Sequence, residues 1–114
     1  MSATALKERL RADLKTALQA RAGDEVRVLR VLIAALDNAE AVPGVQKTYV
    51  PRAFGDPSGE VARLSLDGGA VKALLASEVA ARLAAAADYR SHGRSDEASR
   101  LEAEAALVSR YAEG

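Results

Sequence analysis

Five basic side chains near the start of the sequence have a spacing that suits a phosphate-binding surface. Lys7, Arg11 and Lys15 recur every four residues, so on a helix they line one flank, next to its apolar edge. Arg27 and Arg30 lie one turn apart on the next predicted helix and extend this basic set. A cluster of this kind neutralises phosphates and binds RNA in a salt-dependent, sequence-independent way. We therefore take Lys7, Arg11, Lys15, Arg27 and Arg30 as candidate nucleic-acid-binding residues.

The same five side chains also fit a purely structural role. Lysine and arginine often lay their aliphatic stems over an apolar rim, and Glu8, Asp13 and Glu25 are nearby acids with which they could pair. Charge runs on amphipathic helices are usually solvated faces, and no aromatic residue interleaves this set to stack on bases. The sequence leaves both interpretations open.

Residues suited to catalysis are sparse. The chain has no cysteine, which excludes thiolate catalysis, disulfides and cysteine-ligated metals. His92 is the only histidine. Asp88 and Asp96 are close to it in sequence and could form a weak cation site with it, but a role as a basic residue at a helix C-terminus explains His92 better. Gly68 and Gly69 precede a predicted helix, but the lysine and hydroxyl residue of a phosphate-binding loop are absent at the required spacing. No serine has a recognisable motif that would supply a base to activate it. We expect no catalytic residue, no cofactor and no metal.

Two predicted helices position the basic residues. The first runs from about Thr4 to Ala22, and the second begins after Gly23 with Asp24 as its N-cap and runs to about Ala41. Apolar residues recur at helical spacing in both, at Leu6, Leu10, Leu14, Ala17 and Leu18, and then at Val26, Val28, Leu29, Val31, Leu32, Ile33, Ala35 and Leu36. The tight turn between them predicts an antiparallel hairpin.

A second hairpin follows a long connection. Turn and breaker residues between Val42 and Leu66 predict a loop over 42–66. A third helix begins after Asp67 or Ser65 and ends near His92, where Gly93 suits a left-handed cap. Ser95 caps a fourth helix, with acids in its first turn. The inward residues are Val71, Leu74, Leu75, Val79, Leu83 and Ala86, and then Ala98, Leu101, Ala105, Val108 and Tyr111. We predict a single all-α domain over 1–114, with four principal helices in two antiparallel hairpins.

Overall composition limits the function further. Sixteen basic and sixteen acidic residues cancel, so the molecule as a whole exerts no pull toward nucleic acid. The longest apolar run, Val31 to Leu36, is far shorter than the ~20 residues that span a bilayer. The first residues also lack the pattern of a secretory signal. We expect a cytoplasmic protein with no membrane contact.

Two segments of the chain resemble the GatB/YqeY family. The first comprises Leu6-Lys7-Glu8-Arg9-Leu10, Arg27-Val28-Leu29-Arg30-Val31-Leu32 and Ala34-Ala35-Leu36-Asp37-Asn38-Ala39-Glu40. The second comprises Glu78-Val79, Tyr89-Arg90-Ser91-His92-Gly93-Arg94-Ser95-Asp96, Glu102-Ala103-Glu104 and Tyr111. The two segments occur in the family's order. The turn at Gly93-Arg94 before an acid-rich helix is the most particular element.

The resemblance implies a helical domain that occurs alone or as the tail of the tRNA-dependent amidotransferase B subunit. In that enzyme, the domain helps to hold the misacylated tRNA while other domains do the chemistry. The resemblance also implies a short form, without the small C-terminal three-helix part that the family usually carries. We expect a non-catalytic accessory or adaptor domain, with tRNA or a tRNA-processing protein as its partner.

Two alternatives remain. The apolar character of the second and third helices also suits a protein–protein interaction module without nucleic-acid contact, including a homo-oligomer. The family label of a carbon–nitrogen ligase with glutamine as amido-N-donor names a third possibility, an enzymatic activity. Salt dependence separates the first two, because RNA binding weakens steeply with salt and apolar docking does not.

Overall fold

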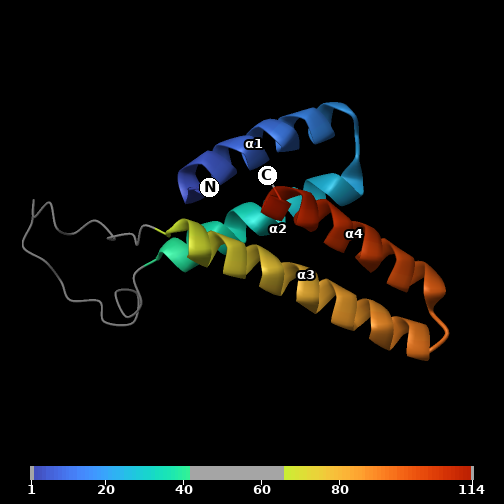
Figure 1. The fold of residues 1–114 in the computed structure, drawn as a ribbon. Coiled ribbons are helices and arrows are strands. Elements are labelled where there is room, and N and C mark those ends of the chain that lie inside the picture. The colour runs from blue at the N-terminus through green and yellow to red at the C-terminus, as the bar shows by residue number, and fades with distance from the viewer. Residues whose placement is uncertain (1, 42–65, 114) are drawn as a thin grey trace, which may run out of the picture.

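The computed structural model describes residues 2–41 and 66–113, which form four helices (Figure 1). The helices are α1 (Ala3–Gln19), α2 (Gly23–Glu40), α3 (Gly68–Ser91) and α4 (Ser95–Glu113). The pairs α1–α2 and α3–α4 are two antiparallel hairpins, which confirms the predicted all-α class and the arrangement within it. The predicted loop over 42–66 lies outside the described residues, except for Leu66. None of the described helices is long and apolar enough to cross a membrane.

Side-chain caps begin two of the helices. The Ser2 hydroxyl accepts a hydrogen bond from the Ala5 N–H at 3.1 Å, and the Asp67 carboxylate accepts one from the Ala70 N–H at 2.7 Å. Each cap satisfies an amide that the first turn of a helix leaves without a backbone partner. Asp67 is thus the cap of α3, while the other candidate, Ser65, lies outside the described residues.

Both hairpin turns use the same backbone motif. At the end of α3, the Arg94 N–H donates to the Tyr89 carbonyl at 2.9 Å and the Gly93 N–H donates to the Arg90 carbonyl at 3.1 Å. This pair of bonds is the Schellman motif, and it needs a left-handed residue, which here is Gly93 with φ 75°. The predicted glycine cap at this turn is confirmed.

The turn between α1 and α2 corrects the sequence prediction. Here the Ala22 N–H donates to the Ala17 carbonyl and the Arg21 N–H to the Leu18 carbonyl, so the Schellman motif closes before Gly23. The left-handed residue is therefore Arg21, with φ 55°. Gly23 is the first residue of α2 instead of the residue that stops α1, and Asp24 lies in the first turn instead of capping it.

The four helices share one apolar core. Its largest fully buried side chains come from every helix: Leu6, Leu10, Val28, Leu29, Leu32, Leu36, Val71, Leu75 and Val108. Burying one leucine or valine side chain contributes about 1.5–3 kcal/mol. The core therefore holds the α1–α2 hairpin against one end of the α3–α4 hairpin.

Two leucines predicted to face the core do not. Leu18 and Leu83 are each 48% exposed, and Val31 is 41% exposed. The reason is the helical period, because each four-residue step advances about 40° beyond a full turn. Leu18 is three such steps after Leu6, and Leu83 is three such steps after Val71, so both side chains have turned away from the buried face. Ala17 and Ala86 occupy the buried positions there instead.

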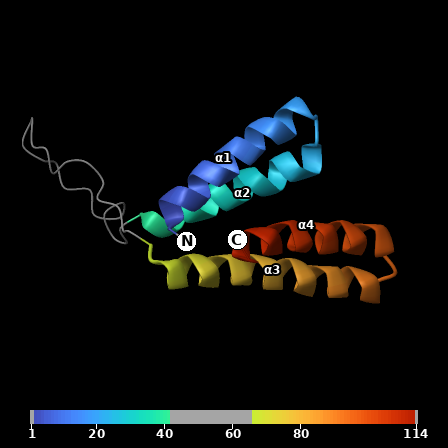
Figure 2. The same cartoon turned by 45° about the horizontal axis from the view of Figure 1, so that its top comes forward.

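The distal half of the α3–α4 hairpin projects beyond the core as an arm (Figure 2). Residues 80–106, all of which the structure describes, contribute nothing to the core cluster. The two helices of the arm meet instead through small buried side chains, Ala86, Ala98 and Ala105. Alanine at these positions permits a close approach of the two helix backbones.

Candidate functional site

Lys7, the first of the predicted basic residues, turns toward α2. Its Nζ lies 3.2 Å from Asp37 Oδ1 and also bonds to the Glu40 carboxylate. The Lys7 side chain is 14% exposed, and Glu40 is buried. The hydrogen bond that Lys7 donates to the Glu40 carboxylate raises the pKa of Lys7, with a smaller opposing effect of burial. Lys7 is therefore engaged within the hairpin and offers little charge to a phosphate.

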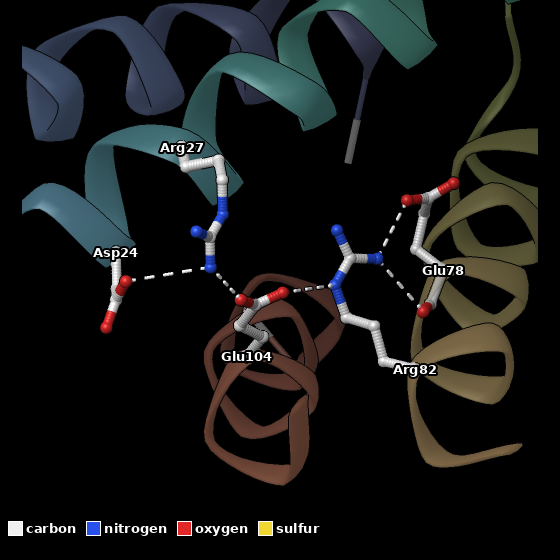
Figure 3. A network of polar contacts seen from close by, with 5 residues as sticks. All are labelled: Asp24, Arg27, Glu78, Arg82 and Glu104. Carbon is white, nitrogen blue, oxygen red and sulfur yellow. Dashed lines mark hydrogen bonds and ion pairs between the residues drawn. The ribbon is translucent and has the colours of Figure 1, made fainter. Parts of the chain in front are cut away.

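Arg27 faces α4 and belongs to a network that joins three helices (Figure 3). Its guanidinium contacts Asp24 at 3.6 Å and bonds to the Glu104 carboxylate. Glu104 also accepts from Arg82 Nε at 3.3 Å, and Arg82 in turn bonds Glu78 at 2.9 Å. The two central side chains, Arg82 and Glu104, are 12% and 11% exposed. Arg27 thus helps to fasten the two hairpins together.

The other three basic candidates remain exposed. Arg11, Lys15 and Arg30 form no ion pair with any described residue. Lys7, near the start of α1, contacts Asp37, near the end of α2. Because the two helices are antiparallel, the turns of α1 after Lys7 lie beside the turns of α2 before Asp37. Arg30 lies two turns before Asp37 and so shares its face. From this geometry we infer that Arg11, Lys15 and Arg30 lie on the same side of the hairpin, which we call the basic flank.

The predicted acidic partners of the basic set are wrong. Neither Lys7 nor Arg27 pairs with Glu8, Asp13 or Glu25; their partners lie on α2 and α4. Asp13 instead accepts a hydrogen bond from the Tyr111 hydroxyl.

That contact at Tyr111 is one the sequence did not reveal. Tyr111 of α4 is 4% exposed, and the Arg9 guanidinium lies 4.7 Å from the centroid of its ring. Burial, with a further contribution from the bond to Asp13, raises the pKa of Tyr111 well above its ordinary value. The cluster joins α1 to α4 across 98 residues of sequence, beyond the reach of any local pattern.

A groove lies between the start of α2 and the middle of α4. Its volume is about 550 Å³, and its lining residues are Asp24, Glu25, Val28, Arg100, Ala103, Glu104, Ala106, Leu107 and Arg110. A second hollow of about 360 Å³ lies next to it, between α1 and the end of α4, and shares Glu25 and Arg110 with the first. We call the larger hollow the inter-hairpin groove. No sequence motif marked it, because it arises where the two hairpins diverge (Figure 2).

His92 is exposed at the end of α3. Its Nδ1 lies 2.8 Å from the Asp88 carbonyl oxygen and 3.8 Å from the Asp88 carboxylate. Within residues 2–41 and 66–113, no group of three or more histidine and acidic side chains has the geometry to hold a metal ion. His92 thus has the contacts of a helix-end residue.

No protein-family model matches the chain, and no curated protein matches it. The resemblance to the GatB/YqeY family stays a prediction based on the residues that carry it.

Proposed function

We propose that this chain is a non-catalytic, cytoplasmic accessory domain of the GatB/YqeY type, which acts by binding tRNA. The observation that supports this proposal is the basic flank. Arg11, Lys15 and Arg30 are each exposed and form no ion pair with the described residues. The flank is narrower than the five-residue set predicted from sequence, because Lys7 and Arg27 serve contacts within the fold.

The small size of the flank sets the expected strength of binding. Three cations neutralise about three phosphates, which gives a log–log salt slope of roughly −2 to −3. The exposed carboxylate of Glu8 on the same helix lowers the local potential. We expect micromolar affinity at ~50 mM salt that is largely lost at ~200 mM, with no preference for base sequence.

Fluorescence anisotropy of labelled bulk tRNA tests the proposal at these two salt concentrations. The variant Arg11→Glu/Lys15→Glu/Arg30→Glu should lose the binding. The matched control, Lys72→Glu/Arg100→Glu/Arg110→Glu, reverses as many exposed charges on α3 and α4 and should retain most of it. Equal losses in both variants would show that net charge alone, and not this flank, controls the binding. An absence of binding by the unaltered protein at low salt would remove tRNA as the partner.

The second candidate function is a protein–protein interaction module. The inter-hairpin groove favours it, because a hollow of about 550 Å³ between two helices, with exposed apolar side chains in its lining, suits contact with a partner. Light scattering at increasing protein concentration tests one form of this function, a homo-oligomer. A mass that stays at that of one chain would leave only a different protein as the partner.

A further inference from the structure

The inter-hairpin groove has an apolar floor and a charged rim. Ala103, Ala106 and Leu107 expose apolar surface to it, and Val28, which is 1% exposed, also lines it. Arg100 and Arg110 stand on the α4 side, and Glu25 stands on the α2 side. All three of these charged residues are exposed and form no ion pair with the described residues. The hollow therefore offers apolar contact along its length and unpaired charges of opposite sign along its two edges.

The spacing of the rim charges matches a helix. Arg100 and Arg110 are ten residues apart on α4, which places them about 15 Å apart along the helix axis. Two carboxylates eleven residues apart on a helical ligand lie on one face at nearly the same separation. A basic residue on the ligand's other edge would then meet Glu25. A groove with apolar side chains between two helices is the kind of site that receives an amphipathic helix.

We propose that the inter-hairpin groove is a docking site for an amphipathic helix of a partner protein. The helix carries an apolar stripe, two carboxylates about three turns apart on one edge, and a basic residue on the other. The apolar stripe packs on Ala103, Ala106 and Leu107, while the carboxylates face Arg100 and Arg110. This proposal rests on the second candidate function, the interaction module.

The lining favours a helix over a small molecule. Small-molecule sites normally combine an apolar wall with a few polar groups directed inward, which fix the orientation of the ligand. Here the charged groups are at the rim, and the one largely buried carboxylate, Glu104, is already bonded to Arg27 and Arg82. Among the described residues, no buried side-chain polar atom lacks a hydrogen-bond partner. The floor thus has no free group to orient a small ligand.

The test uses two synthetic peptides of about 18 residues, roughly 27 Å long as helices. Both carry a leucine stripe and one lysine on the edge that would face Glu25. The first has two glutamates eleven residues apart on the opposite edge, and the second has lysines in their place. Anisotropy of the labelled peptides at ~50 mM salt measures binding to the full chain. We expect the glutamate peptide to bind at least about tenfold more tightly than the lysine peptide.

Three variants locate the contact. Arg100→Glu/Arg110→Glu should reverse the preference, so that the lysine peptide binds more tightly. Ala103→Glu, at an exposed position in the groove, should weaken binding of the glutamate peptide about tenfold or more by placing a charge on the floor. The matched variant Ala87→Glu, at an exposed position on α3, should not. Arg11→Glu/Lys15→Glu/Arg30→Glu should bind the peptide normally, which separates this inference from tRNA binding.

Four results would overturn the proposal. They are no binding of either peptide up to ~1 mM, equal affinity for both peptides, an unchanged affinity in Ala103→Glu, and no reversal in the charge-swapped variant. A different outcome would assign the groove to a small ligand instead. In that case a small apolar dye binds the unaltered protein but not Ala103→Glu, and neither peptide binds. None of these results affects the tRNA titration, so tRNA binding and the groove proposal fail separately.

Discussion

The two ends of the α3–α4 hairpin are held together by different means. At the end that meets α1 and α2, Val71, Leu75 and Val108 are fully buried in the common core. In the arm, the helices touch through alanines, and beyond the largely buried Arg82–Glu104 pair an exposed ion pair crosses between them. Arg90 donates to the Glu102 carboxylate at 2.6 and 3.1 Å, with both side chains nearly half exposed.

The difference shows how an alanine-rich sequence builds a helical domain. Close backbone approach replaces side-chain volume in the arm, so the arm buries much less apolar surface for each residue than the core. Exposed ion pairs add little to stability in water. We therefore expect local opening of the arm to require less free energy than opening of the core.

Removing a core side chain should have the largest effect. Leu32 on α2 is fully buried, and Leu32→Ala should lower the free energy of unfolding by about 2–5 kcal/mol. Leu18→Ala is the matched control, since Leu18 is 48% exposed, and it should change the free energy by about 0.5 kcal/mol or less. Urea denaturation followed by circular dichroism measures both. Similar losses in the two variants would contradict the assignment of the core.

Enlarging an arm side chain should have the next largest effect. Ala98 is fully buried where α4 meets α3, so Ala98→Leu should cost about 1–3 kcal/mol by forcing the helices apart. Ala87→Leu adds the same atoms at an exposed position of α3 and should be nearly neutral. If Ala98→Leu raises the urea midpoint, the arm has more space between its helices than we infer.

Neutralising the network between the hairpins should cost less. Glu104→Gln keeps the shape of the side chain but removes the charge that Arg27 and Arg82 share, and we expect a loss of about 1–2 kcal/mol. Glu102→Gln removes the charge of an exposed pair in the arm and should have a smaller effect. Thermal unfolding of the two variants gives the comparison. A larger loss for Glu102→Gln would reverse our ranking of the two contacts.

Exchanging the residues of the two turns should produce small effects of opposite sign. Arg21→Gly should stabilise the protein by about 0.5–1 kcal/mol, because glycine adopts a positive φ without steric cost. Gly93→Ala should destabilise it by about 1 kcal/mol, even though an added Cβ meets no atom within 4 Å. Urea midpoints test both, and stabilisation by Gly93→Ala would contradict the left-handed turn.

The two regions should also differ in their response to pH. The raised pKa values of Lys7 and Tyr111 mean that the folded state holds protons more tightly, so their stabilisation is complete below about pH 10 and declines above it. The lowered pKa of Glu102 in the arm, caused by Arg90, has the opposite sign: its stabilisation is present above pH 4.5 and is lost as the pH falls.

Melting temperatures between pH 9 and 12 test the alkaline response, and Tyr111→Phe should reduce the decline. Hydrogen exchange of arm amides between pH 3 and 5, corrected for the intrinsic exchange rate, tests the acid response. An arm whose protection is independent of pH, in the unaltered protein, would contradict the contribution of Glu102.

The sequence predicts the helices well because their signals are local. The spacing of leucines, the cap at Asp67 and the glycine at Gly93 each act within one or two turns. The four-residue leucine pattern was less reliable over a whole helix, since its drift carries Leu18 and Leu83 away from the core. Arg21 was missed because a left-handed arginine has no distinctive local signal.

The candidate site was only partly predictable. Four-residue spacing predicts that Lys7, Arg11 and Lys15 share a flank of α1. It does not show that Lys7 meets Asp37 and Glu40, because that contact depends on how α2 packs against α1. The groove and the partners of Arg27 depend on the meeting of the two hairpins, across 77 residues in the case of Glu104.

The distribution of contacts between the helices has a consequence for the kinetics of folding. Most contacts between helices lie within one hairpin or the other, so each hairpin forms through short loop closures. The bonds from Arg27 to Glu104 and from Tyr111 to Asp13 join residues 77 and 98 positions apart, and they require the two hairpins to meet. We expect them to form after the rate-limiting step. Contacts that form late act mainly on the unfolding rate, so these two bonds govern how long the folded molecule persists more than how quickly it forms.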